Sequence, residues 1–76
     1  MKLKNTKVLV TGATGFMGRH LVERLLKEGA DVHAIVENGK VEGVNVYIGD
    51  ITDAGFVKRV VDESEPKVVY HLAALI

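Results

Sequence analysis

Three glycines spaced three residues apart are the residues best suited to hold a ligand: Gly12, Gly15 and Gly18. They follow a run of branched apolar residues and precede a run with helical periodicity. Glycine allows sharp turns and close backbone approach, and the unpaired N–H groups at a helix N-terminus attract anions. We therefore predict a diphosphate-binding turn, in which Gly12 turns the chain, Gly15 admits the diphosphate and Gly18 lets the helix pack on the sheet.

In this turn the backbone N–H groups around Phe16 and Met17 would point at the phosphates, so that no lysine is needed. The sequence lacks the Gly-Lys-Ser/Thr of nucleoside triphosphatase loops, which disfavours triphosphate hydrolysis. The alternative is that the three glycines serve only a tight turn and close packing.

Strand-like and helix-like segments alternate around this turn. Strands are predicted at 7–11, 31–36, 44–48 and 67–72, and helices at 15–28 and from the N-cap Asp53 to about residue 63. The first helix is predicted to have one apolar stripe, made of Phe16, Met17, Leu21, Val22, Leu25 and Leu26. This alternation predicts an α/β fold, a parallel sheet of about four strands with helices on its faces. Right-handed crossovers give the order 3-2-1-4, with the first and fourth strands flanking the topological switch point. The stretch between the second and third strands is too short for a crossover helix, so an extended loop is expected there.

Composition narrows the classes of partner. The chain has 76 residues, 47% hydrophobic and 26% charged, which describes one small domain with a thin stability margin. Ten basic and ten acidic residues cancel, so neither nucleic acid nor an anionic membrane is an expected partner. The sequence has no cysteine, and its N-terminal apolar run is too short for a signal or a membrane span. We expect a soluble, cytoplasmic protein.

Three segments carry a family resemblance: "TGATGFMGRHLVERLL", "YIGDITD" and "VVYHLAA". In this order they resemble the N-terminal part of the extended short-chain dehydrogenases/reductases, the family of nucleotide-sugar epimerases, dehydratases and reductases. The resemblance spans practically the whole chain but only about the first quarter of a typical member. It implies a partial Rossmann fold in which residues 1–76 are the N-terminal half of a dinucleotide-binding domain, as a fragment or an engineered minimal version.

The resemblance also implies roles for particular residues. The segment from Thr11 to Gly18, which includes Thr14, matches the diphosphate loop of the family. Asp50 and Ile51 match a pair whose carboxylate and backbone contact the adenine. Ala73 and Ala74 match the loop that follows the fourth strand and runs along the cofactor toward the nicotinamide. The alternatives are that Asp50 simply ends a strand and that the alanines are packing residues.

The choice of cofactor depends on the end of the second strand. NAD-preferring members carry an acid at the position of Val36, where it holds the ribose hydroxyls, whereas this chain has Glu37 one residue later. The charge of Glu37 would oppose a 2′-phosphate, so NAD is favoured. Arg19 could instead meet that phosphate, so NADP is not excluded. The alternatives are an exposed strand end for Glu37 and a solvated helix face for Arg19.

The catalytic residues of the family have no counterpart in this sequence. The family uses a Ser/Thr and a Tyr-x-x-x-Lys pair, but Tyr47 is followed four residues later by Ile51, and Tyr70 by Ala74. The three histidines are not clustered, so no metal site is predicted.

Three functional hypotheses remain open. The first is a module that binds NAD(P), or its ADP portion, without catalysis. The second is one part of a split NAD-dependent epimerase or dehydratase that needs a further portion. The third is a self-associating fragment that pairs through the open edge of the fourth strand.

Overall fold

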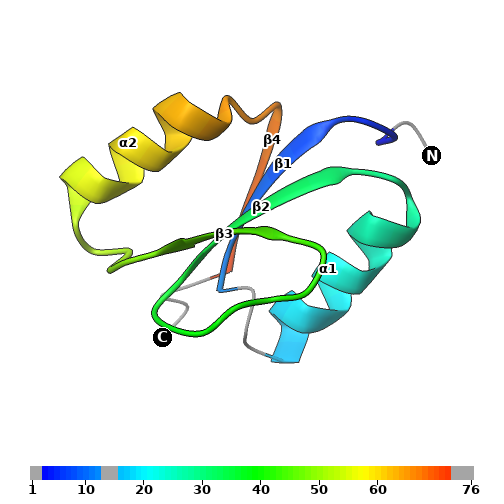
Figure 1. Ribbon diagram of the computed structural model, residues 1–76, viewed down its shortest axis with the longest axis horizontal. Helices are drawn as coiled ribbons and strands as arrows, with labels where there is room; N and C mark the ends of the chain where they lie inside the picture. The colour runs from blue at the N-terminus through cyan, green and yellow to red at the C-terminus, as the bar shows by residue number, and fades with distance from the viewer. Residues whose placement is uncertain (1–2, 13–15, 73–76) are drawn as a thin grey trace.

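The computed structural model describes residues 3–12 and 16–72, which form a four-stranded parallel sheet between two helices (Figure 1). The elements are β1 (Lys7–Thr11), α1 (Phe16–Lys27), β2 (Asp31–Val36), β3 (Asn45–Ile48), α2 (Ala54–Ser64) and β4 (Val68–His71). The strand order is β3-β2-β1-β4, which confirms the order predicted from the crossover rule.

The first face of the sheet packs against α1. Alternate residues of β1 and β2 point to this face and meet the apolar stripe of α1, which includes Val22 and Leu25. The buried members of this α1-face cluster are Val8, Val10, Val22, Leu25, Ala30, Val32, Ala34 and Val36. Met17 was predicted to share the stripe but is 69% exposed. Among the α1 side chains that the structure describes, Leu21, Val22, Leu25 and Leu26 contact the cluster, as predicted.

The second face of the sheet packs against α2 and has a smaller core. Its fully buried members, the α2-face cluster, are Leu9, Ile35 and Val60, and the half-buried side chains of Tyr47, Ile51, Phe56 and Val57 surround them. With a helix over each face, the central strand β1 is buried on both sides, as its unbroken apolar run predicts.

The ends of the elements follow local chemistry. Gly29 ends the turn after α1 with a φ of 82°, a left-handed conformation that glycine adopts without strain. Asp53 caps α2 as predicted, because its carboxylate accepts a hydrogen bond from the Phe56 N–H at 3.1 Å. No helix joins β2 to β3, which are parallel, so the expected extended crossover is confirmed over residues 37–44, all of them described.

Candidate functional site

The four parallel strands end at one border of the sheet, which we call the carboxyl edge. It comprises residues 11–12, 36–37, 48–50 and 71–72, each of which ends or follows a strand. From β1 the chain passes through α1 to β2 on one side, whereas β4 pairs with β1 on the other side. In open α/β sheets, ligands bind outside the carboxyl ends of strands at such a switch point. The carboxyl edge between β1 and β4 is therefore the candidate site.

Gly12 lies directly after β1 and has a φ of 76°. A side chain would strain that conformation, so the predicted turn does require glycine here. Helix α1 begins at Phe16, and its first turn contains no acidic side chain that would offset the positive end of the helix dipole. Gly18 is buried in α1. Two predicted members of the turn, Thr14 and Gly15, lie outside the described residues.

The end of β2 presents one acid to the carboxyl edge. Val36, at the position of the family's ribose-binding acid, is 3% exposed because its side chain belongs to the α1-face cluster. Glu37 is the next residue and is exposed. The acid nearest to the family position is thus on the surface at the correct edge, one residue beyond the strand.

Asp50 follows β3 at the same edge and has a defined orientation. Its Oδ1 accepts hydrogen bonds from the Thr52 N–H at 2.8 Å and the Thr52 hydroxyl at 2.7 Å. These two bonds, the backbone one foremost, lower the pKa of Asp50 below its ordinary value. The exposed carboxylate is therefore an ionised acceptor at neutral pH. A hydrogen bond from the Gly49 N–H to the Val36 carbonyl at 3.0 Å joins this segment to the end of β2.

Ile51 does not present its side chain to the carboxyl edge. It is half-buried and packs against the α2-face cluster. Only its backbone is available for the adenine contact that the resemblance implies. Ala73 and Ala74, expected on the loop after β4, lie outside the described residues.

Sequence reasoning gave no role to one contact that the structure places at the switch point. The hydroxyl of Thr11, at the end of β1, lies 2.8 Å from His71 Nδ1, at the end of β4. Two signals pointed to it: each residue is polar at the end of an apolar run, and each lies in or next to a segment predicted to bind the ligand. Their pairing required the β1–β4 register, in which Thr11 is opposite His71.

A shallow hollow of about 350 Å³ lies beside α1 and the β2–β3 connection. Its lining includes two cations, Arg19 and Lys40, together with Val41 and Glu42. The only basic residue that the sequence suggested for a 2′-phosphate, Arg19, thus shares a surface hollow with a second basic residue.

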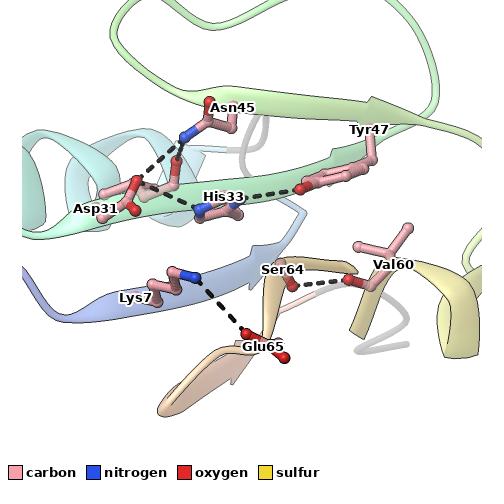
Figure 2. A network of polar contacts seen from close by, with 9 residues as sticks. Lys7, Asp31, His33, Asn45, Tyr47, Val60, Ser64 and Glu65 are labelled. Carbon is pink, nitrogen blue, oxygen red and sulfur yellow. Dashed lines mark hydrogen bonds and ion pairs between the residues drawn. The ribbon is translucent and has the colours of Figure 1, made fainter. Parts of the chain in front are cut away.

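A network of polar residues on β2 and β3 lies away from the switch point (Figure 2). His33 Nδ1 lies 3.0 Å from the Tyr47 hydroxyl, and the two rings stack with centroids 5.9 Å apart. Asn45 Nδ2 donates to Asp31 Oδ1 at 3.1 Å. Within residues 3–12 and 16–72, no group of three or more His, Cys, Asp or Glu side chains is arranged to hold a metal ion.

The strand order, with Gly12 in a left-handed conformation where β1 ends at the switch point, defines a partial Rossmann fold. A model of the NAD dependent epimerase/dehydratase family matches residues 8–76. The chain belongs to the NAD-dependent epimerase/dehydratase family.

Relatives and solved structures agree with this assignment. UDP-glucose 4-epimerase of Neisseria meningitidis is 36% identical over 91% of this chain, and human GDP-mannose 4,6 dehydratase is 31% identical over 87% of it. The NAD complex of UDP-glucose 4-epimerase from Thermus thermophilus superposes with a TM-score of 0.80 at 39% identity, over 91% of this chain and 24% of that one. The NAD complex of the Bordetella bronchiseptica enzyme WbmG superposes with a TM-score of 0.81 at 32% identity, over 99% of this chain and 27% of that one.

The chain spans about a quarter of the length of the curated relatives that it matches, 24% of the Neisseria epimerase and 23% of the human dehydratase. In the described part of the chain, neither helix is long and apolar enough to cross a membrane.

Proposed function

We propose that this chain is the cofactor-binding segment of a nucleotide-sugar epimerase or dehydratase and that it binds NAD, or its ADP portion, at the carboxyl edge. The observation that carries the proposal is the left-handed Gly12 directly after β1 at the switch point, followed in the sequence by α1, whose first turn has no acidic side chain. Backbone N–H groups and the helix dipole there suit a diphosphate.

Each predicted residue has a role in this proposal. Gly12, Thr14 and Gly15 form the diphosphate turn, the N–H groups of Phe16 and Met17 contact the phosphates, and Gly18 brings α1 onto the sheet. The ionised Asp50 carboxylate accepts a hydrogen bond from the adenine amine, and the Ile51 backbone completes that contact. Glu37 accepts hydrogen bonds from the ribose hydroxyls, and Ala73 and Ala74 line the path to the nicotinamide.

Catalysis on a nucleotide sugar is the function of a longer protein in this proposal. The family's acid/base tyrosine and its lysine have no match in this sequence, and the relatives are about four times longer. The chain alone therefore binds dinucleotide without hydride transfer. A complementary portion that supplies the family's catalytic residues would restore hydride transfer.

Calorimetric titration of the chain with NAD, NADP, ADP and AMP tests the proposal. We expect weak binding of NAD and ADP, and weaker binding of AMP, which lacks the diphosphate. The variant Gly12→Ala should abolish the heat of NAD binding, because a Cβ at a φ of 76° would distort the turn. Gly29→Ala is the matched control: it places the same strain at a φ of 82° before β2, at the opposite end of the sheet. No heat at millimolar NAD would contradict the proposal.

The preference for NAD over NADP is tested by two charge variants. Glu37→Gln should lower the ratio of NAD affinity to NADP affinity, because it removes the charge that opposes a 2′-phosphate. Arg19→Gln should leave NAD affinity unchanged and weaken NADP. If the wild-type chain bound NADP more tightly than NAD, the residues that contact the ribose would be those of the hollow lined by Arg19 and Lys40, and not Glu37.

Self-association is a second proposed property, and the exposed edge of β4 favours it. No described strand pairs with the outer side of β4, and Val69 in its middle is 53% exposed. An open, apolar edge strand is a template for pairing with another chain. Sedimentation should show dimers at tens of micromolar, which Val69→Lys should dissociate. A folded monomer at that concentration would contradict this property.

A further inference from the structure

Strand β3 has few neighbours that could fix its position in the sheet. It pairs with β2 on one side, and no described strand pairs with its outer side. The connection from β2, residues 37–44, contains no helix. In the register of the two strands, Asn45 lies opposite His33 and Tyr47 lies opposite Ile35. This register therefore depends largely on the side chains of β3 itself.

The α1 face of β3 does not distinguish one register from another. A shift of β3 by two residues would keep every side chain on its present face, whereas a shift by one would exchange the faces. The alternating residues on the α1 face are Val44, Val46 and Ile48, all branched and apolar. Val44 and Val46 pack against the α1-face cluster, and Ile48 is 60% exposed. After a shift of two, one branched apolar residue would replace another.

The α2 face of β3 carries three different residues, Asn45, Tyr47 and Gly49. Gly49 directly follows the strand and faces the ring of Phe56 from α2: a Cβ on Gly49 would lie 2.6 and 2.7 Å from Cε2 and Cε1 of that ring. A shift of two toward the carboxyl edge would bring Tyr47 to this place, and a shift toward the amino ends of the strands would bring Ile51. Both residues have a Cβ, so the ring of Phe56 opposes both shifts.

Two polar contacts between β2 and β3 oppose one of these shifts as well (Figure 2). Asn45 Nδ2 donates to Asp31 Oδ1 at 3.1 Å, and the Tyr47 hydroxyl lies 3.0 Å from His33 Nδ1. In each pair, the β2 residue lies two positions before the register partner of the β3 residue. A shift toward the carboxyl edge would separate both pairs further, whereas the opposite shift would bring them directly opposite each other. The polar contacts therefore oppose the first shift only, and the second is opposed by the ring of Phe56.

We infer that Gly49 is a positioning residue: together with the ring of Phe56 it selects one register of β3 and thereby places Asp50 at the carboxyl edge. In this register the Gly49 N–H donates to the Val36 carbonyl at 3.0 Å, and Asp50 follows directly. A parallel strand advances by about 3.3 Å per residue, so a shift of two would move Asp50 by about 7 Å along β2. The consequence for adenine recognition rests on the proposed dinucleotide function.

Phe56→Leu in the full chain tests this role, because it deletes the outer ring atoms that approach Gly49 and keeps an apolar side chain on α2. Val57→Ala is the matched control. Val57 packs against the same α2-face cluster, but the three atoms nearest to a Cβ on Gly49 all belong to Phe56. A second control exchanges two residues of the other face, Val44→Ile with Ile48→Val, and should leave the register unchanged.

NMR reports the register through the amide that pairs with the Val36 carbonyl. Wild type and both controls should show one set of β3 resonances, in which the Gly49 amide is protected from hydrogen exchange and contacts Val36. Phe56→Leu should show a second set for about 10% of the molecules, in which the Ile51 amide takes that place. Added NAD should reduce this second population, because a ligand shifts an equilibrium toward the state that it binds better.

Each contrary result has a distinct meaning. Less than about 1% of a second register in Phe56→Leu, or an equally populated second register in Val57→Ala, would overturn the positioning role, and neither measurement needs a ligand. A second register that persists at saturating NAD would overturn the link between the register and binding. If the wild-type chain does not bind NAD, the proposed function fails, while the measurements without ligand still decide what Gly49 does.

Discussion

The two faces of the sheet are stabilised by different means. On the α1 face, eight buried apolar residues of the described part of the chain form one continuous cluster. On the α2 face, the corresponding cluster among residues 3–12 and 16–72 has three buried apolar members, Leu9, Ile35 and Val60. Hydrogen-bonding pairs take up much of that face: His33 with Tyr47 at 3.0 Å and Thr11 with His71 at 2.8 Å.

The difference follows from how the helices cover the strands. Helix α1 packs on β1 and β2, whereas α2 packs mainly on β1, so the outer strands are less covered on the α2 face. Half-buried and exposed positions there accept polar side chains that pair across strands, as Figure 2 shows for Asp31, His33, Asn45 and Tyr47. The α1 face thus supplies most of the dry core, and the α2 face aligns neighbouring strands through specific polar contacts.

Truncation of one leucine on each face should give the largest effects and the clearest contrast. Leu25→Ala, on the α1 face, should lower the free energy of unfolding by about 3–5 kcal/mol, because its close-packed neighbours cannot fill the cavity. Leu9→Ala, on the α2 face, should cost about 2–3 kcal/mol, because half-buried neighbours such as Phe56 can relax. Urea denaturation measures both. Equal losses would show that the faces are packed alike.

The close approach of β3 to α2 should be the next most sensitive point of the α2 face. A Cβ on Gly49 would lie 2.6 and 2.7 Å from the Cε2 and Cε1 atoms of Phe56, so Gly49→Ala should destabilise the fold by about 1–3 kcal/mol. In the control Gly55→Ala, the nearest atom, Asp53 Oδ1, is at an ordinary 3.5 Å, and the change should stabilise the helix by about 0.4–1 kcal/mol. Thermal unfolding distinguishes the two signs, and a stabilising Gly49→Ala would contradict the packing.

The His33–Tyr47 pair should make stability depend on alkaline pH. Burial foremost, and then the charges of Glu63 and Asp31, raise the pKa of Tyr47 above its ordinary value of 10.0. The unfolded chain therefore ionises first, so the contribution of Tyr47 is complete below pH 10 and is lost as the pH rises through the raised pKa. Tyr47→Phe should cost about 1 kcal/mol at neutral pH through the lost hydrogen bond to His33. In denaturation curves, the difference in free energy of unfolding between Tyr47→Phe and wild type should decrease above pH 10. A difference that stays constant would contradict the raised pKa of Tyr47.

The smallest effect is expected at the exposed carboxyl edge. The hydrogen bonds from Thr52 lower the pKa of Asp50 below its ordinary value of 3.8. They therefore stabilise the fold at pH values above 3.8. This stabilisation is lost as the pH falls through the lowered pKa. Thr52→Val should shift the carboxyl titration of Asp50 upward in NMR spectra, and Thr52→Ser should not. An unchanged titration in Thr52→Val would show that the hydroxyl bond is absent in solution.

The backbone of the site was largely predictable because its signals are local. A β-branched run and an apolar stripe with helical spacing predicted β1 and α1 to within one residue of each end. Asp53 was recognised as the cap of α2 because capping acts over three residues. The wrong placement of Met17 has the opposite origin, since periodicity defines a stripe but not how far the sheet extends beneath it.

By itself, the sequence determined the order of strands and helices, the faces that become apolar and the position of the glycine turn, because each depends on neighbours within one or two turns of the chain. Only the tertiary structure decided that Thr11 meets His71, sixty residues later, and that His33 pairs with Tyr47. Such contacts depend on the register between strands, which is set by the packing of the whole sheet between its two helices.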